Sequence, residues 1–225
     1  MILTNTSWDP VWEDVFKNNE WGKYPAESLV RFIARNFYNK NRNQIRILEV
    51  GCGPGANIWY LSREGFQAYG IDGSETAITR AKNRLTQEGL MADLRVGDVV
   101  NLNMFTDGYF DAVIDVECIY GNNQDNAKKI YAEIARVLKK EGLFYSRTFS
   151  EKNVYSQESV KISELEYQEI KNGPLQGKGL VRLMDEKSIE EFYNKHFKII
   201  SIDLLEFTNY NRTHKVSEYI IIAQK

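Results

Sequence analysis

Residues 46–57 constrain the fold of this 225-residue chain more than any other stretch. The apolar run Ile47-Leu48-Glu49-Val50 leads directly into Gly51-Cys52-Gly53-Pro54-Gly55, and an apolar pattern with helical spacing follows. This order predicts a buried parallel strand, a tight turn and a helix N-terminus. Closely spaced glycines let the backbone bend sharply and let a ligand approach it, and the free N–H groups of a helix N-terminus favour a polar or anionic ligand group. We therefore predict a site for a nucleotide-like ligand; the alternative is a turn without a ligand.

Length and composition restrict the class of protein. The length suits one α/β domain, and 29 basic against 31 acidic residues give a formal net charge of −2, which offers no electrostatic attraction for nucleic acid or an acidic membrane. Cys52 and Cys118 do not form a paired metal-binding spacing, so we expect reduced thiols and no metal site. No leader or membrane-spanning run is recognisable. We expect a cytoplasmic protein, a monomer or homodimer, with a small molecule as its partner.

Strands and helices alternate from residue 46 onward, a pattern typical of a parallel sheet covered on both faces. The predicted strands are 47–50, 68–71, 94–96, 110–116 and 143–146, and the predicted helices are 56–64, 74–87 and 126–138. A further helix is expected over 185–195, followed by β-rich runs at 197–207 and 216–223 around a loop at 208–215. The fold class is therefore predicted to be α/β with a doubly wound sheet.

Two segments outside this alternation are predicted to act as lids on a single domain. Residues 1–45 form an N-terminal helical lid in which Trp8, Trp12 and Phe16 are packing residues. Residues 150–183 form a polar insertion or substrate lid, too long for a plain connection. The cofactor-binding core then spans 46–149, and 184–225 supplies a helix and a terminal β-hairpin.

Two cofactor classes compete for the glycine turn. Gly51, Gly53 and Ala56 satisfy the G-x-G-x-x-G/A pattern of dinucleotide-binding proteins, and a carboxylate, Asp72, follows about 20 residues later. Glu49, however, precedes the first glycine by two residues. Acidic side chains near the strand ends favour a cationic cofactor over a pyrophosphate, because burying like charges together is costly.

The order of these motifs resembles that of the class I S-adenosylmethionine-dependent methyltransferases over residues 20–225. Residues 49–55 are similar to the first motif of that family, and Tyr69-Gly70-Ile71-Asp72 is similar to the second. Gly97-Asp98-Val99, Phe110-Asp111-Ala112-Val113 and residues 135–142 resemble three further motifs in the expected order. The resemblance implies a Rossmann-like seven-stranded sheet, mostly parallel, whose last strand is antiparallel. It also implies the cofactor S-adenosylmethionine, which leaves as S-adenosylhomocysteine.

The same resemblance implies the residues that bind this cofactor. It places the methionyl part near the glycine turn, the ribose on Asp72, and the adenine between Gly73 and Asp98. An aromatic lid at residues 21–24 is implied over the cofactor. The complete implied set is Trp21, Tyr24, Glu49, Gly51, Gly53, Gly55, Asp72, Gly73, Asp98, Val99 and Val116.

Residues for acceptor binding and catalysis are expected at the carboxyl ends of the strands. An oxygen or nitrogen nucleophile must lose a proton on methylation, so a nearby base helps. The candidate catalytic residues are His214, Tyr120 and Glu117, with Tyr120 standing where many members of the family have a histidine. The candidate acceptor-binding residues are Tyr120, Arg147, Tyr155 and Arg182, and Arg147, Arg182 and Lys178 together suit an anionic group.

The expected function is methyl transfer from S-adenosylmethionine to an oxygen or nitrogen of a small polar metabolite. A sugar or another biosynthetic intermediate is favoured, because residues 150–180 contain few apolar side chains to cover a lipid tail. The alternatives are an NAD-dependent oxidoreductase with the same fold and a non-catalytic cofactor-binding protein.

Overall fold

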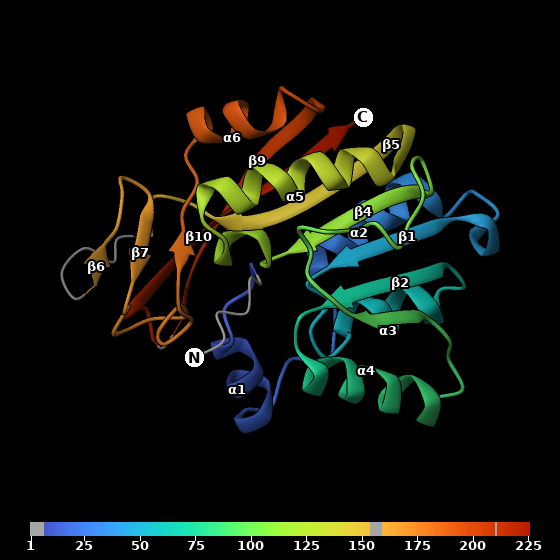
Figure 1. Ribbon diagram of the computed structural model, residues 1–225, viewed down its shortest axis with the longest axis horizontal. Helices are drawn as coiled ribbons and strands as arrows, with labels where there is room; N and C mark the ends of the chain where they lie inside the picture. Colours follow the sequence, from blue (N-terminus) through green and yellow to red (C-terminus); the bar gives the residue numbers. More distant parts are fainter. Residues whose placement is uncertain (1–6, 154–158, 210) are drawn as a thin grey trace.

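A seven-stranded sheet forms the centre of the computed structural model, which describes residues 7–153, 159–209 and 211–225 (Figure 1). Its strand order is β3-β2-β1-β4-β5-β10-β9. The first five strands pair in parallel, whereas β10 runs antiparallel to both β5 and β9. The strands are β1 (Arg46–Val50), β2 (Gln67–Asp72), β3 (Asp93–Val96), β4 (Phe110–Val116), β5 (Leu138–Phe149), β9 (Lys198–Asn209) and β10 (His214–Gln224). This confirms the predicted Rossmann-like sheet with an antiparallel last strand.

Helices cover both faces of the sheet because apolar side chains alternate between its two sides. Ile47 and Ala112 pack among the side chains of α2 (Glu27–Phe37), α3 (Ala56–Arg63) and α4 (Glu75–Gln87). The neighbouring Leu48 and Val113 pack among those of α5 (Gln124–Val137) and α6 (Glu186–Tyr193). Strands buried on both faces carry such continuous apolar runs. The remaining helix, α1 (Val11–Asn18), contacts α4 at one end of the sheet (Figure 1).

Local capping fixes where several helices begin. Ser74 caps α4, because its Oγ accepts a hydrogen bond from the backbone N–H of Ala77 at 3.1 Å. Asp185 and Ser188 form a capping box at the start of α6. Short 3-10 turns occur at η1 (Arg42–Gln44) and η2 (Ile119–Gly121). α5 ends at Val137, close to the predicted end at residue 138, but β5 is longer than the strand predicted at 143–146, because it begins at Leu138, directly after α5.

The insertion folds back onto the core instead of remaining a polar loop. Its strands β6 (Val160–Lys161), β7 (Glu166–Gln168) and β8 (Val181–Arg182) form a small antiparallel sheet. Ile170 and Leu175 are buried in an apolar cluster with Tyr120 and Phe149. A few apolar side chains thus pack the mostly polar insertion against the core. No helix in the described part of the chain is long and apolar enough to cross a membrane.

Candidate active site

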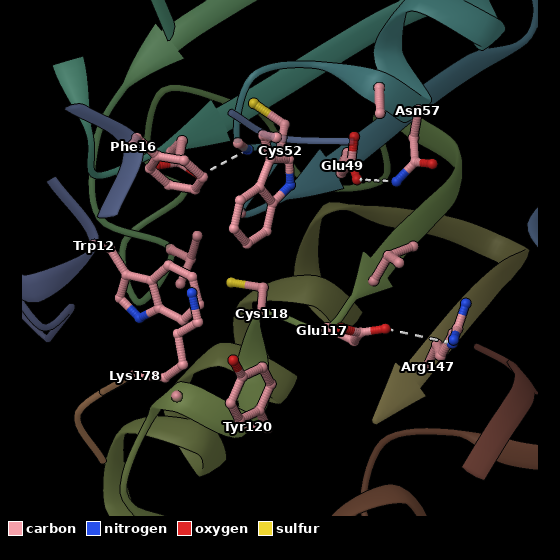
Figure 2. Close-up of a pocket in the computed structure, with 18 of the residues that line it drawn as sticks. Trp12, Phe16, Glu49, Cys52, Asn57, Glu117, Cys118, Tyr120, Arg147 and Lys178 are labelled. Carbon is pink, nitrogen blue, oxygen red and sulfur yellow. Dashed lines mark hydrogen bonds and ion pairs between the residues drawn. The ribbon is translucent and has the colours of Figure 1, made fainter. Parts of the chain in front are cut away.

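A cavity of about 410 Å³ opens at the carboxyl ends of β1, β2 and β4 (Figure 2). The strand order reverses between β1 and β4, and ligands of open α/β sheets bind at such a point. Side chains from α1 and from the insertion complete its walls. The sequence-predicted residues that line it are Trp21, Tyr24, Glu49, Gly51, Gly53, Asp72, Gly73, Val99, Val116, Glu117, Tyr120 and Arg147.

The backbone of the glycine turn lies close to the residues that follow β4. Gly51 and Gly53 adopt φ values of 65° and 50°, in the left-handed region that favours glycine. A Cβ atom on Gly51 would overlap the side chain of Cys118, which follows β4. Gly55 differs, because it caps α3 with φ of 82°, packs against Ala81, and does not line the cavity. The structure therefore assigns Gly55 a packing role, and its predicted contact with the cofactor has no support.

Asp72 ends β2 with its carboxylate tied to the glycine turn. Its Oδ2 accepts a hydrogen bond from the N–H of Gly53 and its Oδ1 accepts one from the N–H of Ser74, both at 2.8 Å. Burial raises the pKa of Asp72, while these two N–H groups act in the opposite direction. Each carboxylate oxygen can accept two hydrogen bonds. Both oxygens can therefore still accept one from a ligand in the cavity.

Glu49 and Asn57 place unpartnered oxygen atoms in the cavity wall. The Nδ2 of Asn57 donates to Oε1 of Glu49 at 2.6 Å (Figure 2). The Oε2 of Glu49 and the Oδ1 of Asn57 are buried without a hydrogen-bond partner among the described residues. Burial, followed by the negative charges of Asp72 and Asp115, raises the pKa of Glu49 well above its usual value. Unpaired buried oxygens cost about 1–3 kcal/mol each, and a cationic ligand that donates hydrogen bonds would both pair with them and favour the charged form of Glu49.

The N-terminal segment covers the corner predicted for adenine. The backbone N–H of Ser7 donates to Oδ2 of Asp98 at 2.6 Å, and the Ser7 hydroxyl donates to Oδ1. Oδ1 also accepts from the N–H of Val100 at 3.1 Å, and Asp98 does not line the cavity. The indole of Trp8 lies where a side chain on Gly73 would project. The N–H and hydroxyl groups of Ser7 therefore use most of the hydrogen-bonding capacity of the Asp98 carboxylate. No sequence pattern indicated this contact.

An ion cluster lies on the opposite wall, where Glu117 follows β4 with φ of 58°. Such strain in a residue other than glycine is often found at functional sites. The Nε of Arg147 donates to the buried Glu218 at 2.8 Å and lies 3.5 Å from Oε1 of Glu117 (Figure 2). Burial, followed by repulsion from Glu218, raises the pKa of Glu117 to about 7, against the effect of Arg147. A carboxyl group with a pKa raised in this way suits a general base near neutral pH.

Aromatic side chains form the remaining wall. The ring centroids of Phe16 and Trp21 are 5.1 Å apart, those of Trp12 and Tyr120 are 6.4 Å apart, and Tyr120 meets Phe149 at 4.9 Å. Trp8, Trp12 and Phe16 were predicted as packing residues, yet all three line the cavity. The four-residue spacing of aromatic side chains does not distinguish these two uses, and no sequence signal singled out Asn57, two residues after Gly55.

Comparisons with known proteins identify the family. A model of the methyltransferase domain matches residues 47–142. An uncharacterised methyltransferase of Schizosaccharomyces pombe is 32% identical over 107 residues, which span 48% of this chain and 73% of that protein. The chain belongs to the class I S-adenosylmethionine-dependent methyltransferases. Like other family members, this methyltransferase uses S-adenosylmethionine, which sets aside the NAD-dependent and non-catalytic alternatives.

Solved structures of methyltransferases share the fold. A methyltransferase from Methanosarcina mazei superposes with a TM-score of 0.72 at 21% identity, covering 90% of this chain and 98% of that one. Magnesium protoporphyrin IX methyltransferase from Synechocystis, solved with bound S-adenosylmethionine, superposes with a TM-score of 0.67 at 14% identity, covering 99% and 100%. At these identities the likeness establishes the methyltransferase fold alone.

Two of the candidates for catalysis or acceptor binding, His214 and Arg182, do not reach the cavity of this methyltransferase. His214 does not line it: β9 extends to Asn209 and His214 begins β10, so His214 belongs to a strand and not to the predicted loop. Arg182 is buried, with its guanidinium donating to the carbonyl oxygens of Asn122 and Ile119, so the predicted grouping with Arg147 and Lys178 is wrong. Tyr155 lies outside the described residues.

Proposed function

We propose that this methyltransferase methylates an oxygen or nitrogen of a small molecule held between Glu117 and the aromatic wall. The observation that carries the proposal is the pair of unpartnered buried oxygens on Glu49 and Asn57, in the same cavity as the ionisable Glu117. The cavity thus has two ends: an acidic end, where Glu49 and Asn57 can accept hydrogen bonds, and a second end, where Glu117 is a candidate base. This arrangement suits a cationic cofactor beside an acceptor that must lose a proton.

The residues of the acidic end fit S-adenosylmethionine. We propose that Asp72 accepts hydrogen bonds from the ribose hydroxyls and that Glu49 and Asn57 accept them from the methionyl ammonium group. The indole of Trp8 supplies a flat surface for adenine, since Gly73 has no side chain and Trp8 occupies that space. Ser7 reduces the contribution of Asp98, because it takes up most of that carboxylate.

When bound, the cofactor supplies a methyl group activated by its sulfonium. The protein then has to align the nucleophile, remove its proton and exclude water. We propose that Glu117 accepts the proton and that the hydroxyl of Tyr120 orients the acceptor. The N-terminal lid, through Trp12 and Trp21, and the insertion, through Leu175, close the cavity over both ligands.

The Glu117→Gln variant tests this assignment in an assay of S-adenosylhomocysteine release with a panel of phenols, carboxylic acids, amines and sugars. Losing a general base typically lowers the rate about 10²–10⁴-fold, so we expect kcat to fall by that factor. The calorimetric affinity for S-adenosylhomocysteine should stay unchanged. A variant with wild-type kcat would remove Glu117 from the mechanism, and the absence of any product from the panel would refute the proposed acceptor class.

A further inference from the structure

Lys178 brings a positive charge from the insertion into the cavity, where it lies against aromatic rings. Its Nζ lies 5.3 Å from the ring centroid of Trp12 and 5.2 Å from that of Trp21. Figure 2 shows the side chain running beside Trp12. Within residues 7–153, 159–209 and 211–225, no salt bridge pairs this ammonium group with a carboxylate. Lys178 therefore differs from Arg147, the other cation lining the cavity, which has two carboxylates beside it.

The burial of Lys178 has an energetic consequence. Removal from water disfavours its charged form and lowers the pKa of the ammonium group. Contacts with ring faces offset only part of this cost. A carboxylate from a ligand would offset more, because charge-assisted hydrogen bonds are among the stronger ones. This end of the cavity is thus complementary to an anionic group.

The surrounding walls define the body of the ligand. Trp12, Tyr120 and Phe149 meet edge to face, and the buried Leu175 completes the surface. Asn122 also lines the cavity, and its Oδ1 is buried without a hydrogen-bond partner among the described residues. A sugar would leave most of its hydroxyl groups against apolar surface, which is unfavourable. An aromatic ring with few polar substituents suits these apolar walls.

The charges at the two ends orient such a ligand. Glu117 and Lys178 lie on opposite sides of Cys118 (Figure 2). Building on the proposed function, we infer that the acceptor is a small aromatic carboxylic acid bearing a hydroxyl or amino group. Its carboxylate pairs with Lys178, its ring lies against Trp12 and Tyr120, and the group to be methylated faces Glu117. This inference replaces the sugar favoured by the sequence.

Binding to the protein loaded with S-adenosylhomocysteine tests the inference without requiring turnover. The probes are 3,4-dihydroxybenzoate, its methyl ester and glucose 1-phosphate, followed by quenching of the fluorescence of the tryptophans in the cavity wall. We expect the acid to bind at least about tenfold more tightly than the ester, and glucose 1-phosphate to bind more weakly than either. Equal binding of acid and ester, or tighter binding of the sugar phosphate, would overturn the inference.

Variants assign the preference to Lys178. Lys178→Met should bring the ratio of acid to ester affinity close to one, whereas Lys178→Arg should keep it well above one. Lys171→Met is the matched control, because Lys171 belongs to the same insertion but is exposed and paired with Glu169. An unchanged ratio in Lys178→Met would refute the role of Lys178. Mass spectrometry of the bound acid after turnover tests the proposed function separately, since binding without methylation would contradict that function alone.

Discussion

The two ends of the cavity are built in different ways. The cofactor end, formed by residues 49–57 and 72–73, follows strands of the matched family region and consists of backbone N–H groups and carboxylates. The acceptor end takes Trp12 from the N-terminal segment and Lys178 from the insertion, both outside residues 47–142. In the proposed scheme, cofactor binding thus depends on the strand ends, whereas acceptor binding also depends on segments outside the matched region.

Replacing Asp72 by alanine should produce the largest change that is confined to the cofactor end. Charged hydrogen bonds contribute about 1.5–3 kcal/mol each without being additive, so we expect the binding free energy of S-adenosylhomocysteine to weaken by about 2–4 kcal/mol. Calorimetric titration measures this loss. Asp98→Ala is the matched control and should lose less, because Ser7 holds the Asp98 carboxylate.

Two further measurements are needed to interpret the loss of cofactor affinity: thermal unfolding of the variants and their affinity for the acceptor. Asp72 also holds the N–H groups of Gly53 and Ser74, so thermal unfolding without ligand should be recorded for both variants. A larger loss of affinity in Asp98→Ala than in Asp72→Ala would exchange the proposed ribose and adenine positions. A weakened acceptor affinity in Asp72→Ala would contradict the separation of the two ends.

Trp8→Ala tests whether a residue outside the matched region contributes to cofactor binding. Trp8 belongs to the N-terminal segment, but we propose that its indole faces the cofactor. Stacking of a base on an aromatic ring is worth about 1–3 kcal/mol, so the affinity for S-adenosylhomocysteine should fall by that amount. Trp8→Phe should retain most of it. Tighter binding by the alanine variant would instead mean that Trp8 competes with adenine for this corner.

The smallest predicted effect is a dependence of kcat on pH. Since the pKa of Glu117 is raised to about 7, the carboxylate becomes protonated and inactive as a base when the pH falls below that value. We expect kcat to decrease about tenfold per pH unit on the acidic side, and Glu117→Gln to lack this limb. S-adenosylhomocysteine affinity over the same range serves as the control, because Glu117 does not bind the ribose or adenine in this scheme.

The fold, and the places of Gly51 and Asp72 in the cavity lining, were predictable because their signals are local in sequence. Glycine spacing after an apolar strand fixes the turn at Gly51, and a carboxylate after the next strand fixes Asp72. The acceptor end depends on contacts between distant segments. The spacing of Trp12 in the sequence is the same whether its side chain packs in the core or lines a cavity. Nothing in the sequence around Arg182 indicates that its side chain is buried against carbonyl oxygens. His214 was misplaced because the hairpin strands extend farther than their apolar pattern.

A crystal structure with S-adenosylhomocysteine would show where the cofactor lies in the cavity. We predict ribose hydroxyls on the carboxylate of Asp72, the amino group against Glu49 and Asn57, and the sulfur facing the space between Glu117 and Tyr120. That arrangement would leave the surface of Trp12 and Lys178 open to the acceptor. A cofactor lying against Lys178, with the oxygens of Glu49 and Asn57 still unpartnered, would contradict the account.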